Sequence, residues 1–391
     1  NKENTSGAHG SPLGENEFQL FLENIGFSGD PFIHDSEIYS YFDEKRADDN
    51  SKFDEWNANL ESKLQSDKNF RQLWNQFNNF ETSEVELEWS SDEASRVVGG
   101  KILNEYGLSN KFIIGGSADL AASTKQVISD NTFGSNNFGG NSIEFGIREH
   151  AMGGIVNGLA LHSNLIPYGS TFLVFSDYMR PSMRLASLMN VNSLFIFTHD
   201  SIYLGEDGPT HQPIEHLMSL RLIPNLDVIR PSNSMELIHS YRYALEKRDN
   251  PKAIILSRQN MKFFDNDVSY KDFQTGAYEF MPGSDITLIA TGSELELAFE
   301  ISTKLKDLSV QIISAPILNR LNEERLESLS LNQNIFTIEL GRTIGWDTYI
   351  QNIKKSFSID SFGESAPIDQ LAEKFNFNAE KISDEIRSLL N

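Results

Sequence analysis

The sequence contains no cysteine among its 391 residues. This absence excludes disulfide bonds, thiolate nucleophiles and metal sites with cysteine ligands, and it favours a cytoplasmic location. No apolar run approaches the roughly 18 residues that a membrane-spanning helix needs. Basic residues are also scarce, because 33 lysines and arginines stand against 56 aspartates and glutamates, for a net charge of −23. Nucleic-acid phosphates and anionic membranes repel such a chain, so we expect neither as a partner.

Several motifs of phosphate and metal chemistry are missing as well. The sequence has no GxGxxG, no P-loop, no HExxH and no Gly-Asp-Gly. The pair Asp265 and Asp267 has Asp-x-Asp spacing, but it lies in a polar stretch where a solvated turn is the better interpretation. We therefore assign no metal ligand within the chain.

The first 80 residues lack the rhythm of alternating strands and helices. They open at Asn1, not at methionine, so we expect a removed leader or a start partway through a larger protein. The spacing of apolar residues in 54–80 predicts one or two amphipathic helices. Their core candidates are Trp56, Leu60, Leu64, Leu73 and Phe77. This apolar surface is too small for an independent domain, so we expect a tail that packs on another part.

From about residue 81 the pattern changes to short apolar runs that alternate with helical segments. The expected strands are 111–114, 194–198, 228–230 and 253–256, and the expected helices are 93–106, 143–161, 177–189, 214–222 and 234–246. A second such unit starts near residue 276, with strands at 286–290, 310–314, 335–340 and 357–360. Ser293 is expected to cap a helix there, with Glu296 as its capping-box partner.

These patterns predict an α/β protein. Apolar strands that alternate with helices form mainly parallel sheets covered by helices on both faces. We expect two such domains in succession, at residues 81–264 and 265–391, after a helical and loop tail at residues 1–80.

Polar side chains follow the expected strands of the first domain. They are Asp119 and Ser123 after the first strand, His199, Asp207 and His211 after the second, Arg230 after the third and Arg258 after the fourth. Ligands of parallel sheets gather at the carboxyl ends of strands, so this set predicts a site for an anionic, hydroxylated small molecule. Each residue alone could instead serve a helix cap, a turn or a structural hydrogen bond.

Glu149 lies in a glycine-rich segment expected to be helical. Phe145, Met152 and Val156 share its stripe, and burial there raises the pKa of a carboxyl group, which could then donate a hydrogen bond to a ring nitrogen. The alternative is a surface pair with Arg148 or His150. Gly146, Gly153, Gly154 and Gly158 cost helix stability, which suggests close packing against another backbone, such as a partner subunit.

Phe172, Phe175 and Tyr178 repeat every three residues just after this segment. They could form an aromatic wall for a flat heteroaromatic ring, although core packing is the usual explanation for such a stripe.

The segments HGSPLG (9–14), GGSADL (115–120), EFGIREHAMGGIVNGLALH (144–162), STFLVFSDY (170–178), THDSIYLGEDGPTHQP (198–213), RPSN (230–233), LSRQN (256–260), ATGSELELA (290–298) and FGESAP (362–367) resemble the transketolase family of thiamine-diphosphate enzymes. They span nearly the whole chain in the family's order. Two positions depart from the family's pattern: Tyr203 stands where a small residue is expected, and Ala122 where proline is frequent.

The resemblance implies roles for individual residues. Glu149 would bind the aminopyrimidine ring of the cofactor, within an aromatic pocket of Phe172, Phe175 and Tyr178, and Asp119 would lie nearby. The substrate channel would be lined by His9, Arg96, Ser123, His199, Asp207, His211 and Arg258. Arg258, Ser123 and, by a looser match, Arg96 would hold the substrate phosphate, while His9 and His199 would lie beside the reacting sugar.

The resemblance also implies a reaction and its partners. A two-carbon ketol unit would pass between ketose and aldose phosphates in the pentose phosphate pathway, with thiamine diphosphate and Mg²⁺ or Ca²⁺. The enzyme would be a cytoplasmic homodimer that forms through the pyrimidine-binding domain, residues 81–264, and the C-terminal domain, residues 265–391. The N-terminal domain that binds the diphosphate and the metal is expected to be largely missing, so we expect the isolated chain to be inactive. The alternatives are one subunit of a split transketolase, a noncatalytic proteolytic fragment, or a related dihydroxyacetone or deoxyxylulose-phosphate synthase.

Overall fold

The computed structural model describes residues 2–79, 85, 92–128, 131–262, 264 and 268–390. The chain divides into two compact units, residues 1–75 and 76–391. The pair Asp265 and Asp267 and the predicted boundary at residues 80 and 81 lie outside the described residues. Among the described residues, no helix combines the length and the apolar character that a membrane crossing requires.

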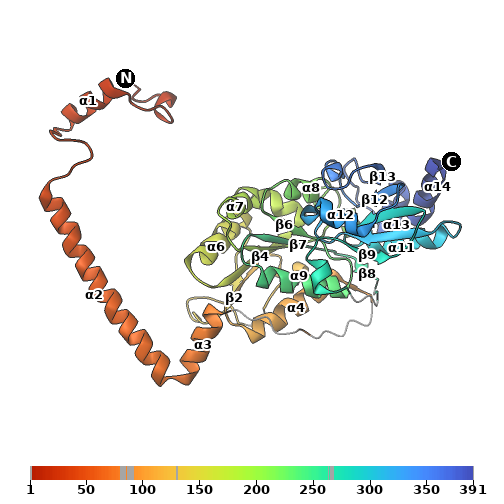
Figure 1. Ribbon diagram of the computed structural model, residues 1–391, viewed down its shortest axis with the longest axis horizontal. Coiled ribbons are helices and arrows are strands. Elements are labelled where there is room, and N and C mark those ends of the chain that lie inside the picture. The colour runs from red at the N-terminus through yellow and green to blue at the C-terminus, as the bar shows by residue number, and fades with distance from the viewer. Residues whose placement is uncertain are drawn as a thin grey trace. The chain divides into compact units, whose positions relative to one another are not determined.

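The first unit is helical (Figure 1). Its elements are η1 (Ser6–Ala8), α1 (Glu15–Asn24), α2 (Ser36–Ser66) and most of α3 (Lys68–Asn78). The predicted helices are confirmed, although α2 begins well before residue 54. The predicted core residues are wrong, since Trp56 is 52% exposed, Leu73 is 37% exposed, and Leu60, Leu64 and Phe77 are only half-buried. The helical period is present here, but α2 buries none of its residues.

The second unit contains a parallel sheet of six strands in the order β3-β2-β4-β5-β7-β6. The strands are β2 (Ile113–Ser117), β3 (Ser142–Glu144), β4 (Ile166–Phe172), β5 (Leu194–Thr198), β6 (Asp227–Ile229) and β7 (Lys252–Leu256). The register is continuous across the middle of the sheet, where Thr198 of β5 pairs with Phe172 on one side and Leu256 on the other. The strand ends that carry the predicted site residues therefore meet at one edge.

Helices cover both faces of this sheet, as the prediction required (Figure 1). One face packs on α4 (Ser95–Ser109) and α9 (Ser234–Glu246), and the other on α6 (Glu149–His162), α7 (Ser176–Leu188) and α8 (His216–Arg221). Leu194 and Ile196 of β5 enter the first core, whereas Phe195 and Phe197 enter the second. A strand buried on both faces explains why β5 reads as a continuous apolar run.

The C-terminal domain is a five-stranded sheet in the order β13-β12-β10-β11-β9. Its strands are β9 (Tyr278–Met281), β10 (Ile286–Ala290), β11 (Val310–Ser314), β12 (Ile335–Ile338) and β13 (Ile353–Phe357). Its helices are α11 (Glu294–Lys304), α12 (Glu323–Leu329), α13 (Ile368–Lys374) and α14 (Ala379–Leu390). Only β9 runs antiparallel to its neighbour among the described strands of this sheet. The predicted α/β class is thus confirmed.

Short elements complete the second unit. They are the pair β1 (Glu93–Ala94) and β8 (Asn260–Met261), helices α5 (Ala121–Thr124) and α10 (Tyr270–Phe273), and the 3-10 turns η2 (Leu173–Phe175), η3 (Ile202–Leu204), η4 (Leu318–Arg320) and η5 (Trp346–Thr348). The β1–β8 pair joins the segment before α4 to the segment after β7.

Three local predictions are wrong. The strand expected at residues 357–360 lies earlier in the chain, as β13 (Ile353–Phe357). The helix expected from residue 143 begins at Glu149, because Ile143 belongs to β3 and Gly146 adopts a left-handed conformation with φ +66°. Ser293 stands at the N-cap of α11 as predicted, but its side chain makes no capping hydrogen bond, and Glu296 instead accepts a hydrogen bond from the Lys262 amide.

Candidate active site

The predicted site residues of the six-stranded sheet lie at one edge, as expected. Asp119 follows β2, His199 follows β5 and Arg258 follows β7, and these strands are close neighbours in a parallel sheet. Ser123 lies on α5, directly after β2. The topology thus places these four side chains beyond the carboxyl ends of the strands.

An aromatic cluster forms beside them. The ring of Phe172 stacks on His199 with centroids 3.7 Å apart, and it stacks on Phe175 at 5.8 Å with planes 10° apart. Tyr178 continues the row at 6.0 Å from Phe175, and His211 meets Phe175 edge-on at 5.6 Å. The aromatic wall exists, but its members come from the end of β4, from η2 and from α7, not from one helix.

Asp119 and His199 share an unusual backbone conformation. Their φ angles are +60° and +61°, in the left-handed region that residues other than glycine rarely adopt. Such strain persists only where the surrounding structure enforces it, and it concentrates at functional sites. The side chain of His199 is 4% exposed, and its Nδ1 lies 2.7 Å from the Thr198 hydroxyl.

The electrostatics around His199 favour the neutral imidazole. Burial, followed by the positive charges of Arg96 and Arg258 and by His211, lowers the pKa of His199 to about 3. A ring that is neutral at pH 7 has one donor nitrogen and one acceptor nitrogen. His199 can therefore bond to a hydroxyl or a carbonyl oxygen without carrying charge.

Arg96 and Arg258 form the basic part of the site. Arg96 donates from Nη1 to the backbone oxygen of Ser123, while its Nε is buried without a hydrogen-bond partner among the described residues. Burial and the charge of Arg258 lower the pKa of Arg96. Both side chains line a cavity of about 790 Å³ between this sheet and the C-terminal domain. A phosphate group would neutralise the pair and accept from both guanidinium groups.

Glu149 is the first residue of α6 and is 9% exposed. Met152 and Val156 are fully buried on the same helix, and Phe145 is buried in the loop before it, so the three apolar residues predicted to share its stripe lie in one core. Arg148 donates to the Phe145 carbonyl at 2.7 Å. This buried carboxyl group could hold a ring nitrogen of a cofactor.

The glycines of this segment have separate structural roles. A Cβ on Gly153 would lie 2.8 Å from the Cβ of Ser182, so this glycine allows α6 to pack closely on α7. A Cβ on Gly154 or Gly158 would meet no described atom within 4 Å. The close packing expected of all four glycines is therefore found within the chain at Gly153.

His9 belongs to the first unit, where it follows η1 and is exposed. Asp207 is exposed and His211 is half-buried, both in the loop after β5. The expected roles of His9, Asp207 and His211 in binding the substrate therefore stay predictions.

Arg230 does not face a ligand. It is fully buried and donates from Nη2 to Asp200 at 2.7 Å, while its Nη1 pairs with Glu294 of the C-terminal domain. A second buried pair, Arg221 and Glu339, crosses the same boundary at 2.7 Å. Glu294 and Glu339 could not be predicted as partners, because they lie in the other domain.

One group of described residues has the composition of a metal site. Asp177, Glu215 and His216 bring one ligand atom each within 4.8 Å of one another. Nε2 of His216 already contacts Asp177 at 3.2 Å, and both carboxyl side chains are more than half exposed. We assign no metal to them.

Comparison with known proteins tests the family directly. Residues 94–263 match the model "Transketolase, pyrimidine binding domain", residues 276–378 the "Transketolase-like TK C-terminal domain", and residues 1–80 the "Transketolase, thiamine diphosphate binding domain". The transketolase of Staphylococcus aureus is 39% identical over 417 aligned residues, which take in 100% of this chain and 62% of that protein. The chain belongs to the transketolase family.

Solved transketolases share the fold. The enzyme of Leishmania mexicana superposes with a TM-score of 0.89 at 29% identity, over 97% of this chain and 58% of that one. A structure titled "Split gene transketolase, inactive beta4 tetramer" gives a TM-score of 0.63 at 25% identity, over 76% of this chain and 98% of that one. The chain therefore spans about three-fifths of the full-length transketolases it matches.

The family match corrects one expectation. The thiamine diphosphate binding domain was predicted to be largely missing, yet its model matches residues 1–80. Residues 1–80, predicted to be only the C-terminal tail of that domain and a linker, therefore match the model of the domain itself.

Proposed function

We propose that this chain takes part in the transfer of a two-carbon ketol unit between ketose and aldose phosphates. One observation carries the proposal: Arg96 and Arg258 line one cavity of a transketolase fold, and their charges act on the buried imidazole of His199. Two positive groups supply a phosphate site, and an uncharged imidazole supplies a partner for the sugar's oxygen atoms.

The cofactor of the proposal is thiamine diphosphate. The row of Phe172, Phe175 and Tyr178 offers a flat ring an aromatic surface, and Tyr178 is 63% exposed and thus open to it. Glu149 would hold a proton at a ring nitrogen, and Asp119 would lie close by. When bound, this cofactor supplies the carbon nucleophile and stabilises the negative charge that develops on the substrate. A divalent ion, Mg²⁺ or Ca²⁺, is part of the proposal, with ligands outside the residues assigned here.

The proposal assigns substrate-binding residues along the length of the sugar, from its phosphate to its reacting carbon. Arg258, Arg96 and Ser123 hold the phosphate, and Asp207 accepts from a sugar hydroxyl. His9, His199 and His211 bond to oxygens near the reacting carbon and can move protons there. A cytoplasmic location belongs to the same proposal.

We also propose that the 391 residues alone turn over no substrate. The sequence lacks a Gly-Asp-Gly motif that could anchor a magnesium diphosphate, and the split-gene transketolase that resembles this chain is described as an inactive beta4 tetramer. That resemblance favours one alternative, a split enzyme whose other chain completes the site. A noncatalytic fragment and a related dihydroxyacetone or deoxyxylulose-phosphate synthase are the remaining alternatives.

The proposed assembly is a homodimer through the pyrimidine-binding and C-terminal domains, with α6 and α7 in the contact. Exposed apolar side chains gather on these helices: Ile155 is 46% exposed, Leu185 48%, Leu188 68% and Met189 45%. Gly154 and Gly158 leave room on α6 for the close approach of a second backbone. Apolar surface of this kind is typical of subunit contacts.

A coupled assay of ketol transfer tests the proposed function. The chain is measured alone, and then mixed with the remaining two-fifths of a full-length relative, in the presence of thiamine diphosphate and Mg²⁺. We expect turnover of xylulose and ribose phosphates only in the mixture or in a full-length fusion. Turnover of pyruvate with glyceraldehyde phosphate, but not of pentose phosphates, would favour the synthase alternative.

A further inference from the structure

The loop between β5 and α8, residues 199–215, carries Asp207 and His211 but contains only the turn η3 as regular structure. Its two apolar anchors do not enter the cores of its own sheet. Ile202 and Ile214 are 0% and 5% exposed, and both pack in the core of the C-terminal sheet with residues such as Leu288. Near both of its ends, the β5–α8 loop is thus anchored by a side chain that packs in the C-terminal domain.

Tyr203 adds a polar anchor. Its hydroxyl donates to the backbone oxygen of Phe377 at 2.8 Å, and its ring packs against the C-terminal core. Burial is the main cause of a raised pKa for this phenol, which therefore remains protonated as a donor at neutral pH. Tyr203 occupies the position at which the family's pattern predicts a small residue, so this anchor is a departure from that pattern.

The loop between β13 and α13, residues 358–367, also contacts the β5–α8 loop. Ser365 donates to the backbone oxygen of Glu206, and Nε2 of Gln212 donates to the backbone oxygen of Glu364 at 2.9 Å. A Cβ on Gly363 would lie 1.9 Å from Oε1 of Gln212, so a larger residue there would displace that amide.

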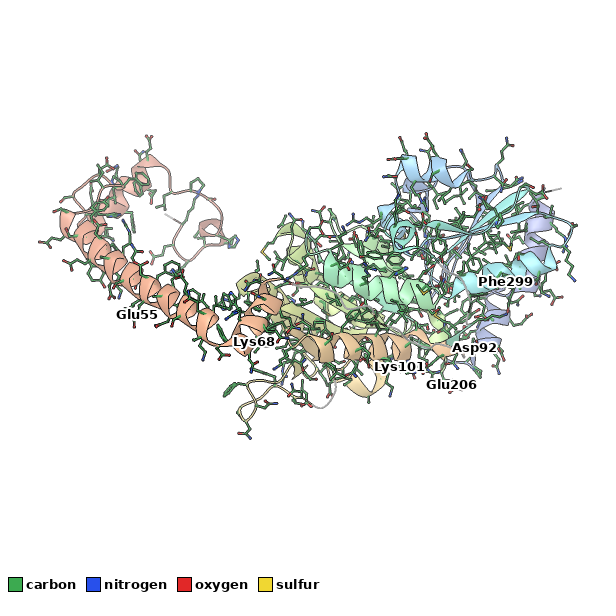
Figure 2. All side chains as sticks on the ribbon, turned by 60° about the horizontal axis from the view of Figure 1, so that its bottom comes forward. Glu55, Lys68, Asp92, Lys101, Glu206 and Phe299 are labelled. Atoms are coloured by element: carbon green, nitrogen blue, oxygen red, sulfur yellow. The ribbon has the colours of Figure 1, made fainter. Side chains whose placement is uncertain are left out.

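These contacts bracket Asp207. The carbonyl of the preceding residue, Glu206, accepts from Ser365, and a Cβ on the following residue, Gly208, would lie 3.3 Å from Cβ of Ser365. Asp207 itself is exposed. Figure 2 labels Glu206, which marks this loop on the second unit. The backbone on both sides of an exposed carboxylate is thus fixed by a domain that supplies none of the proposed site residues.

We propose that Tyr203 and Ser365 are positioning residues, through which the C-terminal domain holds the β5–α8 loop and thereby sets the affinity for the sugar. The inference has two halves. The first, that the C-terminal domain holds the β5–α8 loop, is independent of the proposed function. The second, that the held loop sets the affinity for the sugar, rests on the proposed function. It gives the C-terminal domain a task in substrate recognition without contact with the substrate.

Hydrogen exchange of the whole chain, followed by mass spectrometry, tests the first half without any turnover. Tyr203→Phe and Ser365→Ala each remove one hydroxyl, and we expect amides of the β5–α8 loop to exchange roughly five-fold faster, the factor that corresponds to about 1 kcal/mol for one neutral hydrogen bond. Ser365→Thr keeps the hydroxyl and should restore the slow exchange.

Tyr349→Phe is the matched control. The Tyr349 hydroxyl also donates across the domain boundary, to the backbone oxygen of Arg221 at 3.4 Å, but it does not touch the β5–α8 loop. Unchanged exchange in Tyr203→Phe and Ser365→Ala would overturn the inference. Equal acceleration of the loop in Tyr349→Phe, or acceleration spread through the C-terminal sheet, would overturn it as well.

Kinetics in an active assembly test the second half. We expect Tyr203→Phe to raise KM for the sugar phosphate roughly five-fold and to leave kcat within about two-fold, because the hydroxyl fixes a binding loop and touches no reacting atom. A fall in kcat with unchanged KM would contradict the inference. Faster loop exchange in an assembly that never converts sugar phosphates would support the holding of the loop and contradict the proposed function.

Discussion

The ring of Phe172 lies against the imidazole of His199, with centroids 3.7 Å apart and planes 29° from parallel. The contact follows from the sheet, because Phe172 ends β4 and His199 comes directly after Thr198, its partner on β5. The aromatic face keeps water from the imidazole, and the nearby arginines oppose its protonation. The side chain is therefore held neutral by its position in the fold.

His199 should make the protein less stable in acid. Its pKa is lowered to about 3 in the folded state, from 6.5 in the unfolded chain, so below pH 6.5 the unfolded state takes up a proton that the folded state does not. The contribution to stability is complete above pH 6.5 and is lost as the pH falls toward 3, by up to about 1.4 kcal/mol per unit. Urea unfolding of the wild type and of His199→Gln at pH 7.5, 6 and 5 measures it. The variant should decline less steeply, and parallel declines would contradict the prediction.

Glu149→Ala should abolish ketol transfer in an active assembly and leave the fold intact. The carboxyl group is buried at the start of α6, and the loss of a proton-transfer group costs a reaction at least ~100-fold in rate. The measurement is kcat at saturating thiamine diphosphate, alongside circular dichroism of the same sample. Glu144→Ala, which removes an exposed carboxyl group at the end of β3, is the control. Full activity of the Glu149 variant would remove this residue from the site.

Arg258→Ala should weaken the binding of phosphorylated substrates. A charged hydrogen bond contributes about 1.5–3 kcal/mol, so KM should rise roughly ten-fold or more. A substrate without phosphate, such as hydroxypyruvate, should be used as before, because it makes no contact with this guanidinium. Arg242→Ala, which removes an arginine paired with Glu246 on α9, serves as the control. An unchanged KM for the phosphorylated sugar would exclude the proposed phosphate site.

Arg230→Met should destabilise the chain strongly. The substitution leaves the carboxyl groups of Asp200 and Glu294 buried without their cation, which costs about 3–5 kcal/mol. Arg387→Met removes an exposed pair with Asp307 and should cost at most about 1 kcal/mol. Urea unfolding of both variants makes the comparison. Equal losses would show that the buried network does not join the two domains.

Gly153 and Gly158 should respond in opposite ways to alanine. Gly153→Ala forces a methyl group against Ser182 and should destabilise the chain by about 1–3 kcal/mol. Gly158→Ala meets no described atom, so helix propensity should stabilise the protomer by about 1 kcal/mol while the added methyl weakens the proposed dimer. Unfolding curves and sedimentation velocity distinguish the two effects. A dimer unchanged by Gly158→Ala would place the subunit contact elsewhere.

The strands that were predicted correctly are those with continuous apolar runs. Residues 194–198, 286–290 and 310–314 are strands as expected, because central parallel strands are buried on both faces. The sequence IPYGSTF at residues 166–172 was missed, since its proline and glycine are typical of turns, yet it forms the fully buried β4. Local propensity was overridden there by the neighbouring strands.

The site was predictable to the extent that it follows from topology. Residues that directly follow parallel strands lie at the same edge of the sheet, whichever distant residues they contact. Asp119, His199 and Arg258 could therefore be grouped from the sequence. Arg230 was misjudged because its partner Glu294 is 64 positions away along the chain. The left-handed backbone of His199 also gave no signal, because its cause lies in the surrounding packing.

Ile202 and Ile214 belong to the pyrimidine-binding segment along the chain, but in space they complete the hydrophobic core of the next domain. If the two domains were separated, the C-terminal core would contain cavities at the positions of these side chains. Ile202 and Ile214 would become exposed to water on the other domain. We therefore expect the two sheets to unfold together, in one calorimetric transition. Neither domain can be transplanted into another protein unless the recipient also accepts this exchange of side chains.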